Sequence, residues 1–136
     1  MTLALGVDIG GTKISAGVVD EQGRILDRAR RATPGDVAGT EAAIVSVVHE
    51  LSGRHPVCAV GVGAAGWIAT DRATVLFSPH LAWRDEPLRA SLAEHIDVAL
   101  LVENDANAAV WGEYRFGAGA GREVTDDVLD AVLRLV

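Results

Sequence analysis

Three short β-type runs lie close together in the first 33 residues and constrain the fold more than any other feature of the chain. They are LALGVDI (3–9), KISAGVVD (13–20) and GRILDRARRAT (23–33). Gly10 and Gly11 separate the first two runs, and the turn sequence DEQG (20–23) separates the second from the third. Strands joined by connections this short pair as antiparallel neighbours. The sequence therefore predicts an antiparallel meander at the start of the domain.

The hydrophobic period changes after this meander. In TEAAIVSVVHEL (40–51) apolar residues recur at helical spacing, with Thr40 as the predicted N-cap and Gly53 as the predicted stop. Five further elements are expected, namely a buried strand followed by a Gly-rich loop (57–68), a short strand or extended segment (73–79), a helix (86–96), a buried strand (98–103) and a helix (105–116). The order βββαβαβα predicts an α/β fold with a mixed sheet and helices on both of its faces.

Composition narrows the class of protein. A chain of 136 residues provides one domain, and 49% hydrophobic residues supply a core. The net charge of −7 argues against a nucleic-acid-binding surface, so Arg28, Arg30 and Arg31 are interpreted as a solvated strand edge. The single cysteine, Cys58, excludes an internal disulfide and a multi-cysteine zinc site. Without a signal-like start or an apolar stretch of about 18–20 residues, we expect a soluble, cytoplasmic protein with no membrane partner.

The turn in VDIGGTK (7–13) is a candidate anion site. Gly10 and Gly11 let backbone N–H groups approach an anion, while Asp8 would repel a phosphate unless a cation such as Mg²⁺ lay between them. With Thr12 and Lys13 following, the pattern is consistent with a magnesium–nucleotide site, and a plain β-hairpin turn explains it equally well. It is not a P-loop, because the pattern G-x-x-x-x-G-K-[ST] is absent, and it is not a dinucleotide fingerprint, because a strand follows the glycines.

Two later segments suit a polar ligand. GVGAAG (61–66) has only small residues between its glycines, so its backbone could press against a sugar, although close helix–strand packing is an equal alternative. His80 and Trp83 lie in an irregular stretch, FSPHLAWRDEPL (77–88). An exposed pair of this kind offers a hydrogen-bonding group and an apolar ring face to a carbohydrate. A structural role is the alternative for the histidine.

Asp105 follows a predicted buried strand and opens a predicted helix. Its carboxylate could cap that helix, a contribution of about 1 kcal/mol, and the helix dipole would keep it ionised. Ligands bind at the carboxyl ends of strands in open α/β sheets, where a fixed carboxylate can accept a proton from a substrate hydroxyl. Asn104 beside it can hydrogen-bond to neighbouring hydroxyls. Capping and catalysis are compatible, and position alone does not choose between them.

Taken together, VDIGGTK, GVGAAG and LVENDANAAVWGEYRFGAG resemble the ROK family of sugar kinases and repressors, in particular its bacterial glucokinases, over about residues 3–121. The resemblance implies an actin-like ATPase (ribonuclease H-like) fold with two lobes around a cleft. It also implies transfer of a phosphoryl group from ATP, with Mg²⁺, to the 6-hydroxyl of glucose or a related hexose. Polyphosphate is an alternative donor, and full-length relatives are expected to be homo-oligomeric.

The resemblance also assigns residues. It implies that Asp105 is the catalytic base and also contacts the sugar, and that Asp8 binds Mg²⁺ through water. The residues implied to bind the nucleotide phosphates are Asp8, Gly10, Gly11, Thr12 and Lys13. The other residues implied to bind the sugar are Gly63, Ala64, Ala65, Gly66, His80 and Asn104. His80 stands where many relatives carry an asparagine, so it departs from the family pattern.

The family pattern continues with a Gly-Thr-Gly phosphate loop, a Glu-x-Gly-His sugar motif and often a cysteine-rich zinc motif, which these 136 residues lack. We therefore expect residues 1–121 to form an N-terminal lobe with little kinase activity alone. Residues 122–136, with helical spacing from Val124 to Leu135, are expected to be a helical tail or the truncated entrance to a second lobe. The alternatives are a sugar-responsive ROK repressor, disfavoured by a first strand starting near Leu3 and by the negative charge, and a non-catalytic sugar-binding remnant.

Overall fold

A mixed β-sheet forms the centre of the computed structural model, which describes residues 2–78 and 83–117. Its strand order is β3-β2-β1-β4-β8. The first three strands, β1 (Leu3–Ile9), β2 (Lys13–Val19) and β3 (Ile25–Ala32), form the predicted antiparallel meander. Both β4 (Val57–Ala64) and β8 (Ala99–Asn104) run parallel to β1. The predicted mixed sheet is confirmed.

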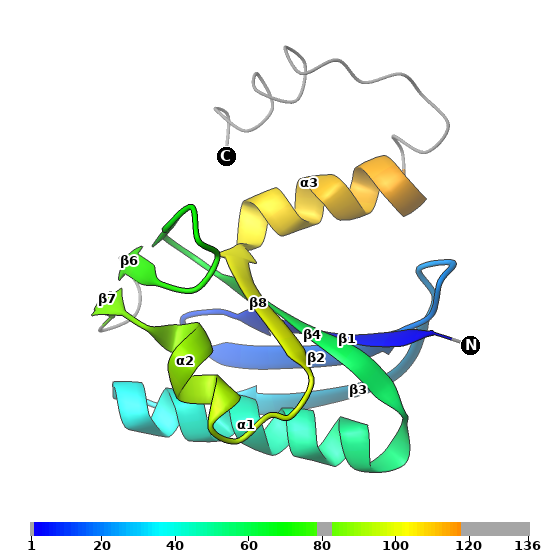
Figure 1. Cartoon of the computed structure of the whole chain (residues 1–136), viewed down its shortest axis with the longest axis horizontal. Helices are drawn as coiled ribbons and strands as arrows, with labels where there is room; N and C mark the ends of the chain where they lie inside the picture. The colour runs from blue at the N-terminus through cyan, green and yellow to red at the C-terminus, as the bar shows by residue number, and fades with distance from the viewer. Residues whose placement is uncertain (1, 79–82, 118–136) are drawn as a thin grey trace.

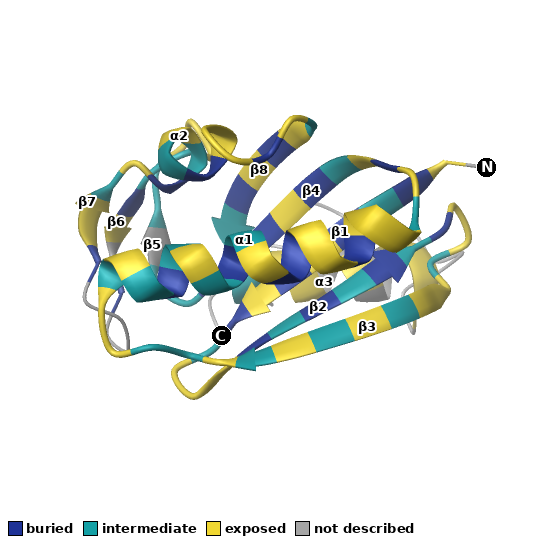
Figure 2. Ribbon diagram, turned by 90° about the horizontal axis from the view of Figure 1, so that it is seen from below, coloured by how far each residue is buried: buried dark blue, intermediate teal, exposed yellow. Residues whose placement is uncertain are grey.

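Helices cover the two faces of this sheet unequally (Figure 1). The long helix α1 (Val37–Arg54) and the short helix α2 (Leu88–Ala93) lie on one face, and α3 (Asp105–Phe116) lies over the other. Alternate strand residues such as Leu5, Val7 and Ile9 are buried toward α1, as period-two alternation requires. Each such side chain contributes about 1.5–3 kcal/mol on full burial. Figure 2 shows the matching buried stripe along α1.

The start of α1 lies one turn earlier than the sequence predicts. Asp36 is its N-cap, and its carboxylate accepts the N–H of Gly39 at 2.6 Å. The predicted cap, Thr40, lies inside the helix, where its hydroxyl donates to the carbonyl of Asp36 at 2.7 Å. The helix also continues through Gly53 to Arg54. Both predicted ends were wrong, because an acidic cap one turn upstream and packing of the apolar face outweigh local preference.

A second, smaller antiparallel sheet lies between β4 and α2 in the chain. It contains β5 (Trp67–Ile68), β6 (Val75–Phe77) and β7 (Arg84–Glu86) in that order. The sequence predicted a short strand or extended segment over 73–79, where β6 lies, but it missed β5 and β7, because strands of two or three residues show no periodicity. Trp83, expected to be exposed for carbohydrate contact, is only 1% exposed and belongs to the core. That expectation was wrong.

The helix predicted over 86–96 is shorter in the structure and begins after Pro87. No described helix combines the length and apolar character needed to cross a membrane. His80 and the predicted tail at 122–136 lie outside the described residues, as does the domain boundary expected at residue 121.

Candidate functional site

Polar side chains gather where the parallel strands end. Asp8 in β1 pairs with Gly63 in β4, which pairs with Glu103 in β8. Residues paired across strands point to the same face, so Asp8 and Glu103 share the face opposite α1. A cavity of about 790 Å³ lies there, lined by these three residues together with Ser15 and Asp105. The carboxyl ends of parallel strands thus carry the candidate site, as expected for an α/β sheet.

Asp105 is the first residue of α3 and lies against β4. Its Oδ1 accepts the N–H of Ala106 at 2.8 Å. A Cβ atom at Gly63 would lie 3.5 Å from the Cα of Asp105, so the two backbones are in close contact. The N-cap bond that the sequence suggested for Asp105 belongs instead to Asn104, whose Oδ1 accepts the N–H of Asn107 at 3.1 Å. The carboxylate of Asp105 is therefore positioned by the helix start without serving as its cap.

Asn104 joins the Gly-rich loop to α3. Its Nδ2 donates to the carbonyl of Gly66 at 2.8 Å, while its Oδ1 caps the helix. Gly66 has φ of 124°, a conformation that other residues rarely adopt. The structure therefore brings four of the predicted sugar-binding residues together, because Gly63, Gly66, Asn104 and Asp105 all lie at this junction. A sugar hydroxyl binding to Asn104 would share or replace one of these two bonds.

Asp8 and Asp105 influence each other electrostatically. Partial burial, followed by the negative charge of Asp105, raises the pKa of Asp8 above its ordinary value. A cation near Asp8 would offset this repulsion. The described residues contain no group of three or more His, Cys, Asp or Glu arranged to hold a metal ion. A metal at Asp8 would therefore take most of its ligands from water or phosphate, which fits Mg²⁺.

The turn at residues 10–13 is a tight hairpin supported by β3. Gly10 donates its N–H to the carbonyl of Lys13 at 2.9 Å, and a Cβ at Gly10 would lie 3.0 Å from that oxygen. Thr33, which follows β3, makes two hydrogen bonds to this turn. Its N–H donates to the carbonyl of Thr12 at 3.0 Å, and its hydroxyl donates to the carbonyl of Gly10 at 2.8 Å. Gly11, Thr12 and Lys13 remain exposed. Sequence reasoning missed Thr33, since only the strand register reveals it.

The remaining predicted sugar-side residues are placed less favourably. The Ala64 side chain is fully buried, so that residue can reach a ligand only through its backbone. Ala65 is half-buried in the following loop. Sequence reasoning also missed Glu103, whose Oε1 accepts the N–H of Asn104 at 2.8 Å and the Nδ2 of Asn107 at 3.3 Å. The sequence feature that could have identified Glu103 is its position, because it is an acidic residue at the end of a buried strand.

This fold and site correspond to a known class of protein. The sequence profile of the ROK family matches residues 4–129, and the chain belongs to that family. Its mixed sheet with flanking helices is the actin-like ATPase fold of the ROK sugar kinases.

Three relatives illustrate the match. Glucokinase of Streptomyces coelicolor is 50% identical over 121 residues, covering 89% of this chain and 38% of the relative. A ROK family glucokinase from Streptomyces griseus, solved with glucose and AMPPNP, is 56% identical with a TM-score of 0.85, covering 88% of this chain and 38% of that one. An inorganic polyphosphate/ATP-glucomannokinase from Arthrobacter sp. strain KM is 34% identical with a TM-score of 0.80, covering 89% and 51%. The chain thus spans well under two thirds of the length of each of these three proteins.

Proposed function

We propose that these residues form the N-terminal lobe of a glucokinase-type hexose kinase, which transfers a phosphoryl group from ATP to the 6-hydroxyl of glucose. The observation that carries the proposal is the meeting of Asp8, Gly63 and Asp105 at the carboxyl ends of adjacent strands. The similarity to a Streptomyces griseus glucokinase that binds glucose and AMPPNP supports it.

In this proposal Asp105 is the general base. Its backbone is fixed between Gly63 and the first turn of α3, so the carboxylate is held ready to accept the proton of the sugar hydroxyl. A positioned base of this kind contributes about 10²–10⁴ in rate. Asn104 and the loop from Gly63 to Gly66 orient the sugar, and His80 is a further candidate contact.

The phosphate side of the site is the hairpin turn that contains Gly10, Gly11 and Thr12, followed by Lys13. Its exposed residues can approach the transferred phosphate, and Thr33 keeps the turn rigid. Mg²⁺, held by Asp8 through water, would neutralise phosphate charge. ATP is the proposed donor, and polyphosphate is the alternative, supported by the similarity to the Arthrobacter glucomannokinase.

We place the protein in the cytoplasm, in hexose catabolism, with no nucleic-acid or membrane partner and with homo-oligomers formed by its full-length relatives. The match to the glucokinase of Streptomyces coelicolor covers 121 residues and 38% of that protein's length. We therefore expect little turnover from them alone.

A coupled assay for glucose 6-phosphate tests the proposal. The 136-residue chain is compared with a chimera in which residues 1–117 replace the matching part of the Streptomyces coelicolor glucokinase. We expect turnover by the chimera with ATP and glucose and almost none by the chain alone. A folded chimera that phosphorylates no hexose with either ATP or polyphosphate would contradict the proposed activity. Robust turnover by the isolated chain would contradict the proposal that these residues supply only one lobe of the kinase active site.

A further inference from the structure

Arg72 adopts an unusual backbone conformation. It lies in the turn between β5 and β6 with φ of 54°, in the left-handed region where glycine is favoured. A long side chain at such a position carries a conformational cost that glycine would avoid. The contacts of Arg72 supply a reason for an arginine at this position.

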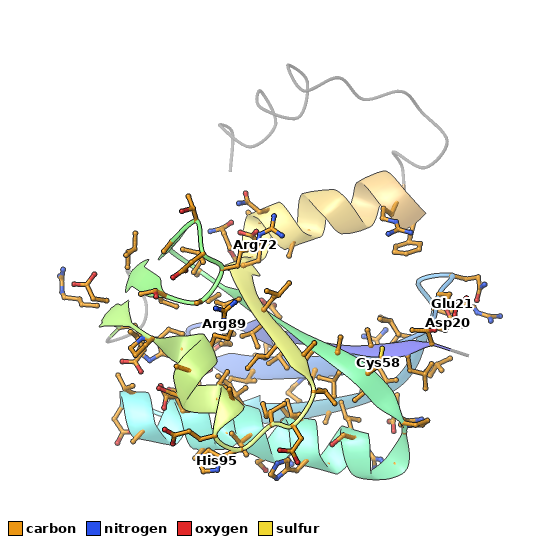
Figure 3. The ribbon with its side chains drawn as sticks, in the orientation of Figure 1. Asp20, Glu21, Cys58, Arg72, Arg89 and His95 are labelled. Carbon is orange, nitrogen blue, oxygen red and sulfur yellow. The ribbon has the colours of Figure 1, made fainter. Side chains whose placement is uncertain are left out.

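Arg72 contacts the strand that leads into α3. Its carbonyl accepts the N–H of Val102 at 3.0 Å, and its Nε lies 3.4 Å from Oε2 of Glu103. Figure 3 shows Arg72 beside the junction of β8 and α3. Within the described sheet β8 is an edge strand, so this turn docks on its free side. The small sheet is thereby attached to the strand that carries the candidate site.

The Glu103 carboxylate connects this contact to the start of α3. While Oε2 faces Arg72, Oε1 accepts the N–H of Asn104 and the side-chain amide of Asn107. Asn104 in turn holds the carbonyl of Gly66. These bonds lead from the turn, through Glu103, to Asn104 and Asn107, which lie on either side of Asp105 in the chain.

We propose that Arg72 is a positioning residue, which acts through Glu103 to fix the Asn104–Asp105 junction against the sugar-side loop. This proposal rests on the proposed function for its meaning in catalysis, but its geometry can be tested separately. Arg72 is 57% exposed and Glu103 31% exposed, and an ion pair this open to solvent adds little stability. Its effect therefore lies in orientation and not in holding the fold together.

The test uses the full 136-residue chain and the substitution Arg72→Gly. Glycine relieves the left-handed backbone, so the melting temperature should stay level or rise. Loss of the guanidinium should shift the side-chain amide NMR signals of Asn104 and Asn107 and weaken glucose binding severalfold in calorimetry. Glu103→Gln should give the same changes, and the double variant should be no worse than either single variant, because both act on one contact.

Asp85→Gly is the matched control. Asp85 is the other described non-glycine residue with positive φ, at 49°, and it lies in β7. We expect it to leave the asparagine signals and glucose binding unchanged. If Arg72→Gly and Glu103→Gln left the asparagine signals as unchanged as Asp85→Gly does, the positioning role would be refuted. If the wild-type chain bound no glucose, the proposed function would lose support, while the asparagine signals would still decide the role of Arg72.

Discussion

Gly63 sets how closely β4 approaches the proposed base. A Cβ atom at this position would lie 3.5 Å from the Cα and 3.7 Å from the Cβ of Asp105, which is ordinary van der Waals contact. One added carbon therefore fits, whereas a branched side chain would add two more carbons beside the backbone of Asp105. The pairing of Gly63 with Asp8 and Glu103 means that any displacement would widen the site at its centre.

Substitutions at Gly63 should distinguish the effect of one added carbon from that of a branched side chain. We expect Gly63→Ala to change the free energy of unfolding by less than about 1 kcal/mol, because no atom must move. Gly63→Val should cost about 1–3 kcal/mol through overpacking. Urea unfolding of both variants measures the difference. Equal stability of the alanine and valine variants would show that α3 is not held against β4 at this point.

Among the elements, α3 spans the open face of the sheet between two anchors. Its first turn is held by Asn104 and Glu103, and its last residue, Phe116, lies against Gly23 in the turn between β2 and β3. Gly23 has φ of 80°, and a Cβ there would lie within 3.0 Å of three Phe116 ring atoms. The far end of the helix thus lies against a glycine in a distant hairpin.

Gly23→Ala should loosen that second anchor. The left-handed backbone alone costs about 1–2 kcal/mol for a residue with a Cβ, and the ring must also move. We expect a lower melting temperature, together with faster hydrogen exchange in the last turn of α3 than in its first. Gly53→Ala serves as a control, because a Cβ at Gly53 would meet nothing within 4 Å and alanine favours the helix around it. Uniform exchange along α3 would contradict the two-anchor arrangement.

Sequence reasoning was most reliable for elements whose pattern is long. The meander was predicted from its short connections, α1 from helical spacing, and β4 and β8 from apolar runs, and α3 was predicted as well. The strands β5 and β7 of the small sheet were missed, because they are too short to show a period, and Trp83, next to β7, was wrongly expected to be exposed. In the site, motif residues such as Asp8 and Asp105 were recognisable, whereas Thr33, Arg72 and Glu103 act through contacts that only the folded backbone creates.

At the scale of the whole molecule, three glutamates from different elements lie near one another. They are Glu41 in α1, Glu86 in β7 and Glu94 directly after α2. Burial first, then a hydrogen bond with Glu86 and the charges of Glu86 and Glu94, raise the pKa of Glu41 from 4.5 to about 7. One carboxyl oxygen of Glu41 is buried without a hydrogen-bond partner among the described residues. The folded protein therefore holds a proton here that the unfolded chain releases.

The direction of the pH effect follows from this difference. Between pH 4.5 and about 7 the folded state binds more protons, so stability falls as the pH rises through that window. Glu41→Gln should remove this fall and raise the free energy of unfolding at pH 8 by about 1 kcal/mol or less, since solvent screens the site. Below pH 4.5 the two proteins should be alike. Urea unfolding at pH 4 and pH 8 measures the effect, and a larger gap at pH 4 would contradict it.

The proposed phosphoryl transfer depends on one carboxylate, that of Asp105, at the meeting of β4, β8 and α3. The measurement that tests this most directly is kcat for glucose phosphorylation by the chimera described above, with and without Asp105→Asn. Because Asn104 supplies the helix cap, the substitution should leave the melting temperature nearly unchanged. We expect kcat to fall by about 10²–10⁴, the contribution of a positioned base. A folded Asp105→Asn chimera with the turnover of its parent would contradict the account.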